Sequence, residues 1–191
     1  MLAKTYSFGI HGLDAYLLTI EVFVSGGLPS TIIVGLPDNA IRESKERVRS
    51  AIKNSGYKFE PRRITINLSP ADIKKEGPSF DLAMALGILA ATGQINTSSL
   101  EQYGILGELS LDGGIHPIRG ALSIALSLGH QNGRENFPAL KGLILPLANA
   151  FEASVIPQIP LYPVKNLKEA VELLNNPQAF ESFRADDKRP G

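Results

Sequence analysis

Residues 75–93 read KEGPSFDLAMALGILAATG, and this stretch decides the fold. Over 80–92 the sequence is apolar on every side of a helix except at Asp81, a pattern typical of a helix buried over most of its surface. A Gly-Pro turn precedes this helix, and Gly93 can close it in a left-handed conformation. We therefore expect a central helix around which the other elements pack, with Ser79 at its N-terminus.

Runs of alternating or β-branched residues predict strands on both sides of this helix. They are expected at 3–10, 15–24, 31–34, 63–68, 103–106, 115–118, 143–145 and 161–164. Glycine and proline between the first three runs predict two hairpin-like connections. Strands and helices interleave without strict alternation, which favours an α/β (α+β) mixed sheet with helices packed on it.

The other helices carry their own start and stop signals. Asp38 is a plausible N-cap of a helix that Gly56 ends, and Asn166 with Glu169 forms a capping-box pattern at the start of another. A third helix is expected over 120–128. The inward face of the first of these helices is predicted from helical spacing to comprise Ile41, Ser44, Val48, Ala51 and Ile52.

Composition excludes several classes of protein. The 191 residues include 19 Lys and Arg against 19 Asp and Glu, so there is no strong field of either sign. With no cysteine there can be no disulfide, thiolate zinc site or Cys nucleophile, which fits a cytoplasmic protein. No apolar run approaches the ~20 residues that span a bilayer. We expect no membrane association.

Metal and nucleotide sites are not expected in this chain. His11, His116 and His130 stand far apart and lack a second ligand at metal-binding spacing. A phosphate-binding loop of the form G-x-x-x-x-G-K-S/T is absent, as is a G-x-G-x-x-G entering a helix. The chain is therefore predicted to carry no cofactor.

Ser79 admits two interpretations. Its hydroxyl can cap the free backbone N–H groups of the buried helix, which requires nothing more. Alternatively, a hydroxyl at a helix N-terminus can be a nucleophile whose oxyanion meets the same donors, but this requires a general base. Lys74, Lys75 or His116 can supply one only if the fold brings it close.

A basic and aromatic run forms a second candidate site. Single-stranded nucleic acid is often held by cations along its backbone and by stacked rings. The same residues also suit a helix end and a connecting loop whose rings plug the core. The candidate nucleic-acid-binding residues are Lys53, Lys58, Arg62 and Arg63, with Tyr57 and Phe59 between them.

Several separated motifs together resemble a known family, the Mg-chelatase-like AAA+ ATPases of the ComM/YifB type, and more distantly the proteolytic domain of Lon-type proteases. The resemblance covers about residues 1–176. It rests on Gly77-Pro78-Ser79 at the head of the apolar helix, on IEV at 20–22, VGLPDNA at 34–40 with Glu43-Ser44, SPADIKKEG at 69–77 and GELSLDGGIHPI at 107–118.

This resemblance implies a Lon-protease-like fold, also described as ribosomal-protein-like, for an N-terminal domain over 1–176. Residues 177–191 would be a linker toward an AAA+ module that lies outside this chain and binds ATP and Mg. The whole would assemble with neighbouring subunits into a homo-oligomeric ring, a hexamer, that acts on DNA in branch migration, recombination and competence. The domain itself would serve assembly, DNA binding or partner binding.

The same resemblance indicates whether the catalytic dyad of Lon-type proteases is present in this chain. Lon-type enzymes use a Ser-Lys dyad, and its serine position falls on Ser79, whereas its lysine position falls on Leu122. A leucine cannot accept a proton, and general-base assistance is typically worth 10²- to 10⁴-fold in rate. We therefore expect Ser79 to be a vestigial nucleophile and the chain not to be an enzyme. The alternative is a Lon-like serine peptidase that uses Ser79 with a non-standard base.

Overall fold

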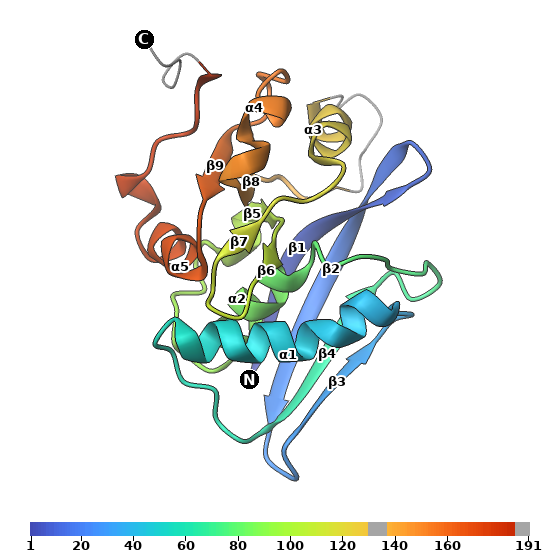
Figure 1. Cartoon of the computed structure of the whole chain (residues 1–191), viewed down its shortest axis with the longest axis vertical. Helices are drawn as coiled ribbons and strands as arrows, with labels where there is room; N and C mark the ends of the chain where they lie inside the picture. The colour runs from blue at the N-terminus through green and yellow to red at the C-terminus, as the bar shows by residue number, and fades with distance from the viewer. Residues whose placement is uncertain (130–136, 186–191) are drawn as a thin grey trace.

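The computed structural model describes residues 1–129 and 137–185. Its main feature is a seven-stranded mixed sheet with the strand order β3-β4-β2-β1-β5-β8-β9 (Figure 1). The strands are β1 (Leu2–His11), β2 (Asp14–Ser25), β3 (Ser30–Val34), β4 (Arg63–Ser69), β5 (Tyr103–Ile105), β8 (Gly142–Pro146) and β9 (Leu161–Val164), and a separate two-stranded sheet pairs β6 (Glu108–Leu109) with β7 (Ile115–His116).

Helices flank the main sheet. They are α1 (Asn39–Asn54), α2 (Asp81–Ala91), α3 (Ala121–Gly129), α4 (Ala150–Ala153) and α5 (Leu167–Asn175), with short 3₁₀ turns at Leu100–Gln102, Leu147–Asn149 and Pro177–Ala179. The mixed α/β class predicted from the sequence is confirmed. The strand expected over 115–118 is shorter than predicted, and β6 and α4 were not expected.

Helix α2 is the centre of the molecule, as predicted. Every residue from Asp81 to Ala91 is buried, because α2 packs between the sheet and α1. Gly87 lies against Val22 of β2, and a Cβ there would come within 2.7 Å of a Val22 methyl group. The helix can therefore approach β2 closely only because this residue has no side chain.

The strand pairing confirms one predicted hairpin and corrects the other. Strands β1 and β2 pair antiparallel along their whole lengths. The loop 26–29 does not make a hairpin, because β4 lies between β2 and β3 and pairs parallel with β3. Two parallel neighbours need a crossover connection, and α1 provides it. In this way the apolar face of α1 is brought against α2, which itself lies on the sheet (Figure 1).

The predicted caps of α1 and α5 are confirmed. Asp38 Oδ1 accepts a hydrogen bond of 2.9 Å from Ile41 N, and the buried face of α1 consists of the five residues that the spacing indicated. At its end Gly56 has a φ of +89°, and Tyr57 N donates to Ile52 O. Asn166 caps α5 through Glu169 N at 2.9 Å.

A second, smaller core lies between α3 and strands β8 and β9 (Figure 1). Phe183 packs against it, donates a hydrogen bond of 2.7 Å to Leu161 O, and places its ring 5.3 Å from that of Phe151. Phe183 therefore lies against this second core. Residues 186–191 of the proposed linker and 130–136, including His130 and most of the loop 131–140, fall outside the described residues.

Candidate functional site

The segments 36–38 and 75–77 are far apart in the sequence but are hydrogen-bonded to each other next to the candidate site. Lys75 N donates to Leu36 O, and Asp38 N donates to Lys75 O, each at 3.0 Å. The Asp38 carboxylate caps α1 with one oxygen and accepts from Gly77 N at 3.0 Å with the other. A single side chain therefore fixes both the start of α1 and the turn that leads into α2.

The side chain of Lys75 is enclosed next to these paired segments. Its side chain is fully buried, and its ammonium group donates to the carbonyl oxygens of Pro70 and, at 2.7 Å, of Gly35. Burial lowers the pKa of Lys75, and the nearby carboxylate of Asp72 partly opposes this shift. The lysine is thus a structural clamp between two chain segments, a role that the sequence did not reveal.

This burial has a consequence for pH dependence. Because the pKa of Lys75 is lower in the folded chain than in the unfolded chain, the unfolded chain binds more protons between those two values. Lys75 should therefore contribute to the free energy of unfolding a component that rises as the pH increases toward 10.5, the ordinary lysine value. Urea unfolding between pH 8 and about 10 measures this slope.

The matched variants for that measurement are Lys75→Met and Lys74→Met. The first removes the buried amine, so its unfolding free energy should lack the rising component. The second removes the exposed amine of Lys74, so its unfolding free energy should still contain the component that rises with pH. Equal slopes in both variants would show that Lys75 does not titrate in this way.

Ser79 lines a groove of about 500 Å³ between the end of β1 and the segments 76–80 and 117–119. Its carbonyl accepts from Gly107 N at 2.9 Å, whereas its hydroxyl has no hydrogen-bond partner within residues 1–129 and 137–185. The prediction that Ser79 caps α2 is wrong. The helix begins at Asp81, and its N-cap is Phe80, which makes no side-chain cap bond.

The cap fails because of the backbone at the helix start. Phe80 already has helical dihedral angles, φ −95° and ψ −2°, and Asp81 N donates to Pro78 O in the preceding turn. This extra turn sets Ser79 one residue too early to act as the N-cap. Ser79 is partly exposed and lines the groove, and no side-chain cap bond is made to the first turn of α2.

The described residues offer Ser79 no amine as a base. Leu122, to which the resemblance assigns the lysine position, lies on α3, is 37% exposed and does not belong to the lining of the groove. Lys75 is held by two carbonyls, and Lys74 lines a different hollow beside the start of α1. The cation that does line the groove is Arg119, whose guanidinium is always protonated in proteins.

Two carboxylates, however, share the groove with Ser79. Glu76 and Glu108 both belong to its lining, and both are ionisable groups of a type that can accept a proton. His116, the third base considered from the sequence, is exposed on β7 and does not belong to this lining. Among the described residues that line the groove, the two glutamates are therefore the candidates for a non-standard base.

Asp81 is the centre of a buried polar network behind the groove. Its carboxylate is completely buried and accepts hydrogen bonds from Ser44 Oγ at 2.5 Å, Arg47 Nε at 2.7 Å and Leu109 N at 3.1 Å. Burial raises the pKa of Asp81, and the bonds from Arg47 and Ser44 oppose that shift. The Asp81 bond in turn raises the pKa of Arg47. The network ties α1, α2 and β6 together.

The basic run is exposed but not arranged as a stacking surface. Lys53, Lys58, Arg62 and Arg63 are all exposed, and Arg62 Nε lies 3.2 Å from a carboxylate oxygen of Glu60. The rings of Tyr57 and Phe59 pack against the main core. The cations are therefore available to a phosphate backbone, whereas the rings serve the fold.

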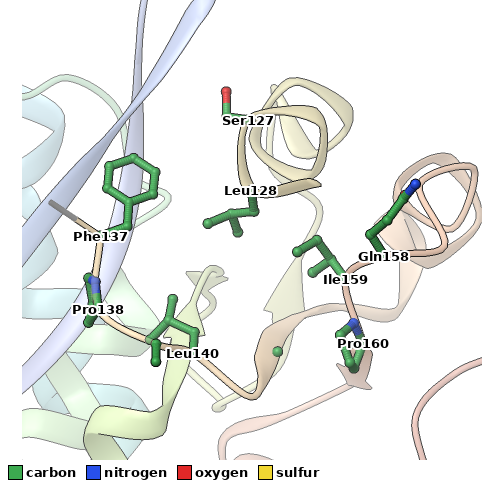
Figure 2. A pocket seen from close by; sticks show the side chains of 10 residues that line it. Ser127, Leu128, Phe137, Pro138, Leu140, Gln158, Ile159 and Pro160 are labelled. Atoms are coloured by element: carbon green, nitrogen blue, oxygen red, sulfur yellow. The ribbon is translucent and has the colours of Figure 1, made fainter. Parts of the chain in front are cut away.

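A second hollow lies between α3, the segment 137–140 and the segment 158–160. Its volume is about 320 Å³, and Figure 2 shows Leu128, Leu140 and Ile159 pointing toward one another across it. Ser127 supplies a hydroxyl at one side. Among the described residues the lining is mainly apolar and includes no charged side chain, so these residues offer packing surface rather than chemistry.

Neither a metal centre nor a membrane span is found in the described part of the chain. Within it, no three His, Asp or Glu side chains gather as metal ligands. Likewise, no helix there combines the length and the apolar character that crossing a membrane requires.

The mixed sheet, the central buried helix and a serine in a groove at its head define a Lon-protease-like α/β domain. The family model described as subunit ChlI of Mg-chelatase matches residues 20–149. The chain belongs to this family.

Comparison with individual proteins agrees with this assignment. The chain is 39% identical to the uncharacterized protein YifB of Salmonella typhimurium over 97% of its length, and 40% identical to the competence protein ComM of Haemophilus influenzae over 91%. It is 30% identical to the Lon protease of Buchnera aphidicola over 87%. These matches span 35%, 33% and 22% of the three relatives, so the chain corresponds to about a third or less of each.

Proposed function

We propose that this chain is a non-catalytic domain of a larger ATP-driven protein and serves assembly or binding. Two points support the proposal: the Ser79 hydroxyl has no hydrogen-bond partner in the described residues, and the resemblance to Lon-type proteases assigns the position of their dyad lysine to Leu122. A serine without a base stays protonated near neutral pH and is a poor nucleophile.

A peptidase assay tests this proposal. Incubated with unfolded casein and with a panel of fluorogenic peptides, the chain and its Ser79→Ala variant should show the same background rate. A rate that exceeds background at least tenfold and is lost in Ser79→Ala would overturn it.

The alternative function is a serine peptidase with a glutamate base. It is favoured by one observation, the presence of Glu76 and Glu108 in the lining of the Ser79 groove. If it operates, either Glu76→Gln or Glu108→Gln should abolish the same activity as Ser79→Ala. Absence of cleavage at every pH between 5 and 9 would dismiss this alternative.

For the whole protein, we propose an AAA+ ATPase module that binds ATP and Mg, follows the linker 177–191, and assembles into a cytoplasmic hexameric ring acting on DNA. The support is family membership and the similarity to a protein named for competence. Within this chain no phosphate-binding loop exists, so the nucleotide chemistry would belong wholly to that module. Mass determination and ATPase assays on the full-length protein test this proposal.

DNA contact by this domain is proposed through the exposed cations Lys53, Lys58, Arg62 and Arg63. If these residues contact phosphates, the affinity for single-stranded DNA must fall steeply with salt, because each neutralised phosphate releases counterions. Arg62→Glu with Arg63→Glu should weaken binding at least tenfold at low salt, as measured by fluorescence anisotropy. Lys168→Glu, at an exposed position of α5, is the control. An affinity that changes neither with salt nor in the Arg62→Glu, Arg63→Glu double variant would refute the contact.

A further inference from the structure

Strand β3 leaves one edge of the main sheet open. It stands last in the strand order, and within the described residues its only strand neighbour is β4. Exposed edges are usually protected by charges, proline or a covering element, because their free N–H and C=O groups can pair with another chain. Strand β3 reads STIIV, without charge or proline.

The hydrogen bonding of β3 shows which backbone groups point outward. Ser30 N donates to Arg62 O, and Ser30 is in register with Arg63. In a parallel ladder the alternate residues face the same neighbour, so Ser30, Ile32 and Val34 direct their backbone groups toward β4. Thr31 and Ile33 therefore direct their N–H and C=O groups away from the sheet.

This arrangement is self-complementary. If two copies of β3 run antiparallel about a two-fold axis at Ile32, Thr31 of each copy faces Ile33 of the other. Each of these residues then both donates to and accepts from its counterpart, so the outward groups of both strands are satisfied. The central Ile32 meets its own copy in a close pair, in which β-branched side chains pack well.

The face of the sheet away from α1 and α2 does not obstruct this pairing. On that face the register aligns Ile32 with Thr65, Phe23 and Leu2 across four strands. Three of them are exposed apolar side chains, Ile32 at 37%, Phe23 at 49% and Leu2 at 64%. Pairing of two β3 strands would join two such rows into one.

Electrostatics do not oppose this contact. The whole chain has a formal net charge of zero, so two copies do not repel each other strongly. The paired strands themselves bring no charged side chain to the axis.

We propose that β3 is an interface at which two copies of this chain pair edge to edge and form one continuous sheet (β3 is drawn in light blue in Figure 1). The partner is a second copy because the edge matches itself about Ile32. The inference does not depend on the proposed function. The contact is two-fold, so it differs from the head-to-tail contacts that would close a ring.

A five-residue edge is far smaller than a typical stable interface of about 800 Å² per partner, so the dimer should be weak. Sedimentation equilibrium on the 191-residue chain should show the 20.6 kDa monomer and its dimer with a dissociation constant on the order of 0.1 to 1 mM. A monomer at every concentration up to ~1 mM would overturn the proposal.

Three variants identify the surface used. Thr31→Pro removes an outward N–H without touching the ladder to β4, and Ile32→Lys places like charges at the axis. Each should weaken the dimer at least tenfold. Phe23→Lys changes the open face away from the edge and should leave dimerisation intact.

The variants also separate edge pairing from other association. A dimer that survives both Thr31→Pro and Ile32→Lys, or that is lost in Phe23→Lys alone, would overturn the edge contact in favour of face-to-face stacking. Urea unfolding confirms that each variant is folded. If Thr31→Pro unfolds the chain, Ile32→Lys still decides, because its side chain lies on the open face.

Discussion

Replacing Asp81 by alanine should lower the free energy of unfolding by about 3 kcal/mol or more. The substitution leaves the Arg47 guanidinium, which is only 19% exposed, without the carboxylate that it contacts at 2.7 Å. It also removes the acceptor of the Ser44 hydroxyl and of Leu109 N. A buried charge that has lost its partner costs far more than the pair itself contributes. Urea denaturation at pH 7 measures this loss.

A double variant distinguishes the cost of an orphaned charge from the contribution of the pair. Asp81→Leu combined with Arg47→Met removes both charges and keeps similar volume, so it should recover a large part of the stability lost in Asp81→Ala. Glu43→Ala is the surface control. Glu43 is 73% exposed and lies 3.8 Å from Arg47, a contact typically worth less than ~1 kcal/mol. Equal losses in Asp81→Ala and Glu43→Ala would contradict this account of the network.

Gly35→Ala should also destabilise the fold by about 3 kcal/mol or more. Gly35 has a φ of +105°, which side-chain-bearing residues rarely adopt, and an added Cβ would lie 2.1 Å from the carbonyl oxygen of Leu68. The clash is with backbone, so β4 or the loop must move. Because the Gly35 carbonyl also receives the Lys75 ammonium group, such a shift would release the clamp beneath the Ser79 groove.

The control for this substitution is Gly26→Ala. Nothing lies within 4 Å of a Cβ at Gly26, and its φ is outside the left-handed range, so the change should stay within about 0.5 kcal/mol. Thermal unfolding of both variants provides the comparison. A Gly35→Ala variant as stable as Gly26→Ala would contradict the close packing of loop 35–38 against β4.

Much of the fold could be predicted because local patterns and tertiary packing agree. The run 80–92 is apolar on every side, which only a buried helix tolerates, and α2 is indeed buried throughout. The caps at Asp38 and Asn166 depend on a few neighbouring residues and were likewise predictable. The order of the strands was not, because insertion of β4 between β2 and β3 depends on where α1 docks.

The site was harder to predict because it depends on contacts across long sequence separations. Lys75 stands in a charged run that is typical of an exposed loop, yet segments 35–38 and 70 enclose it. Asp81 was the one polar residue in an apolar helix, a signal that a buried partner must exist, but nothing in the sequence singled out Arg47. Ser79 failed as a cap because the helix starts two residues later.

The central claim is that the Ser79 hydroxyl is not an activated nucleophile. A fluorophosphonate probe reacts covalently with activated serines, and intact-protein mass spectrometry after incubation at pH 7.5 reports any adduct. The account predicts that the chain and its Ser79→Ala variant both remain unlabelled, while an active serine protease in the same tube is labelled fully. Stoichiometric labelling of the chain that disappears in Ser79→Ala would contradict it.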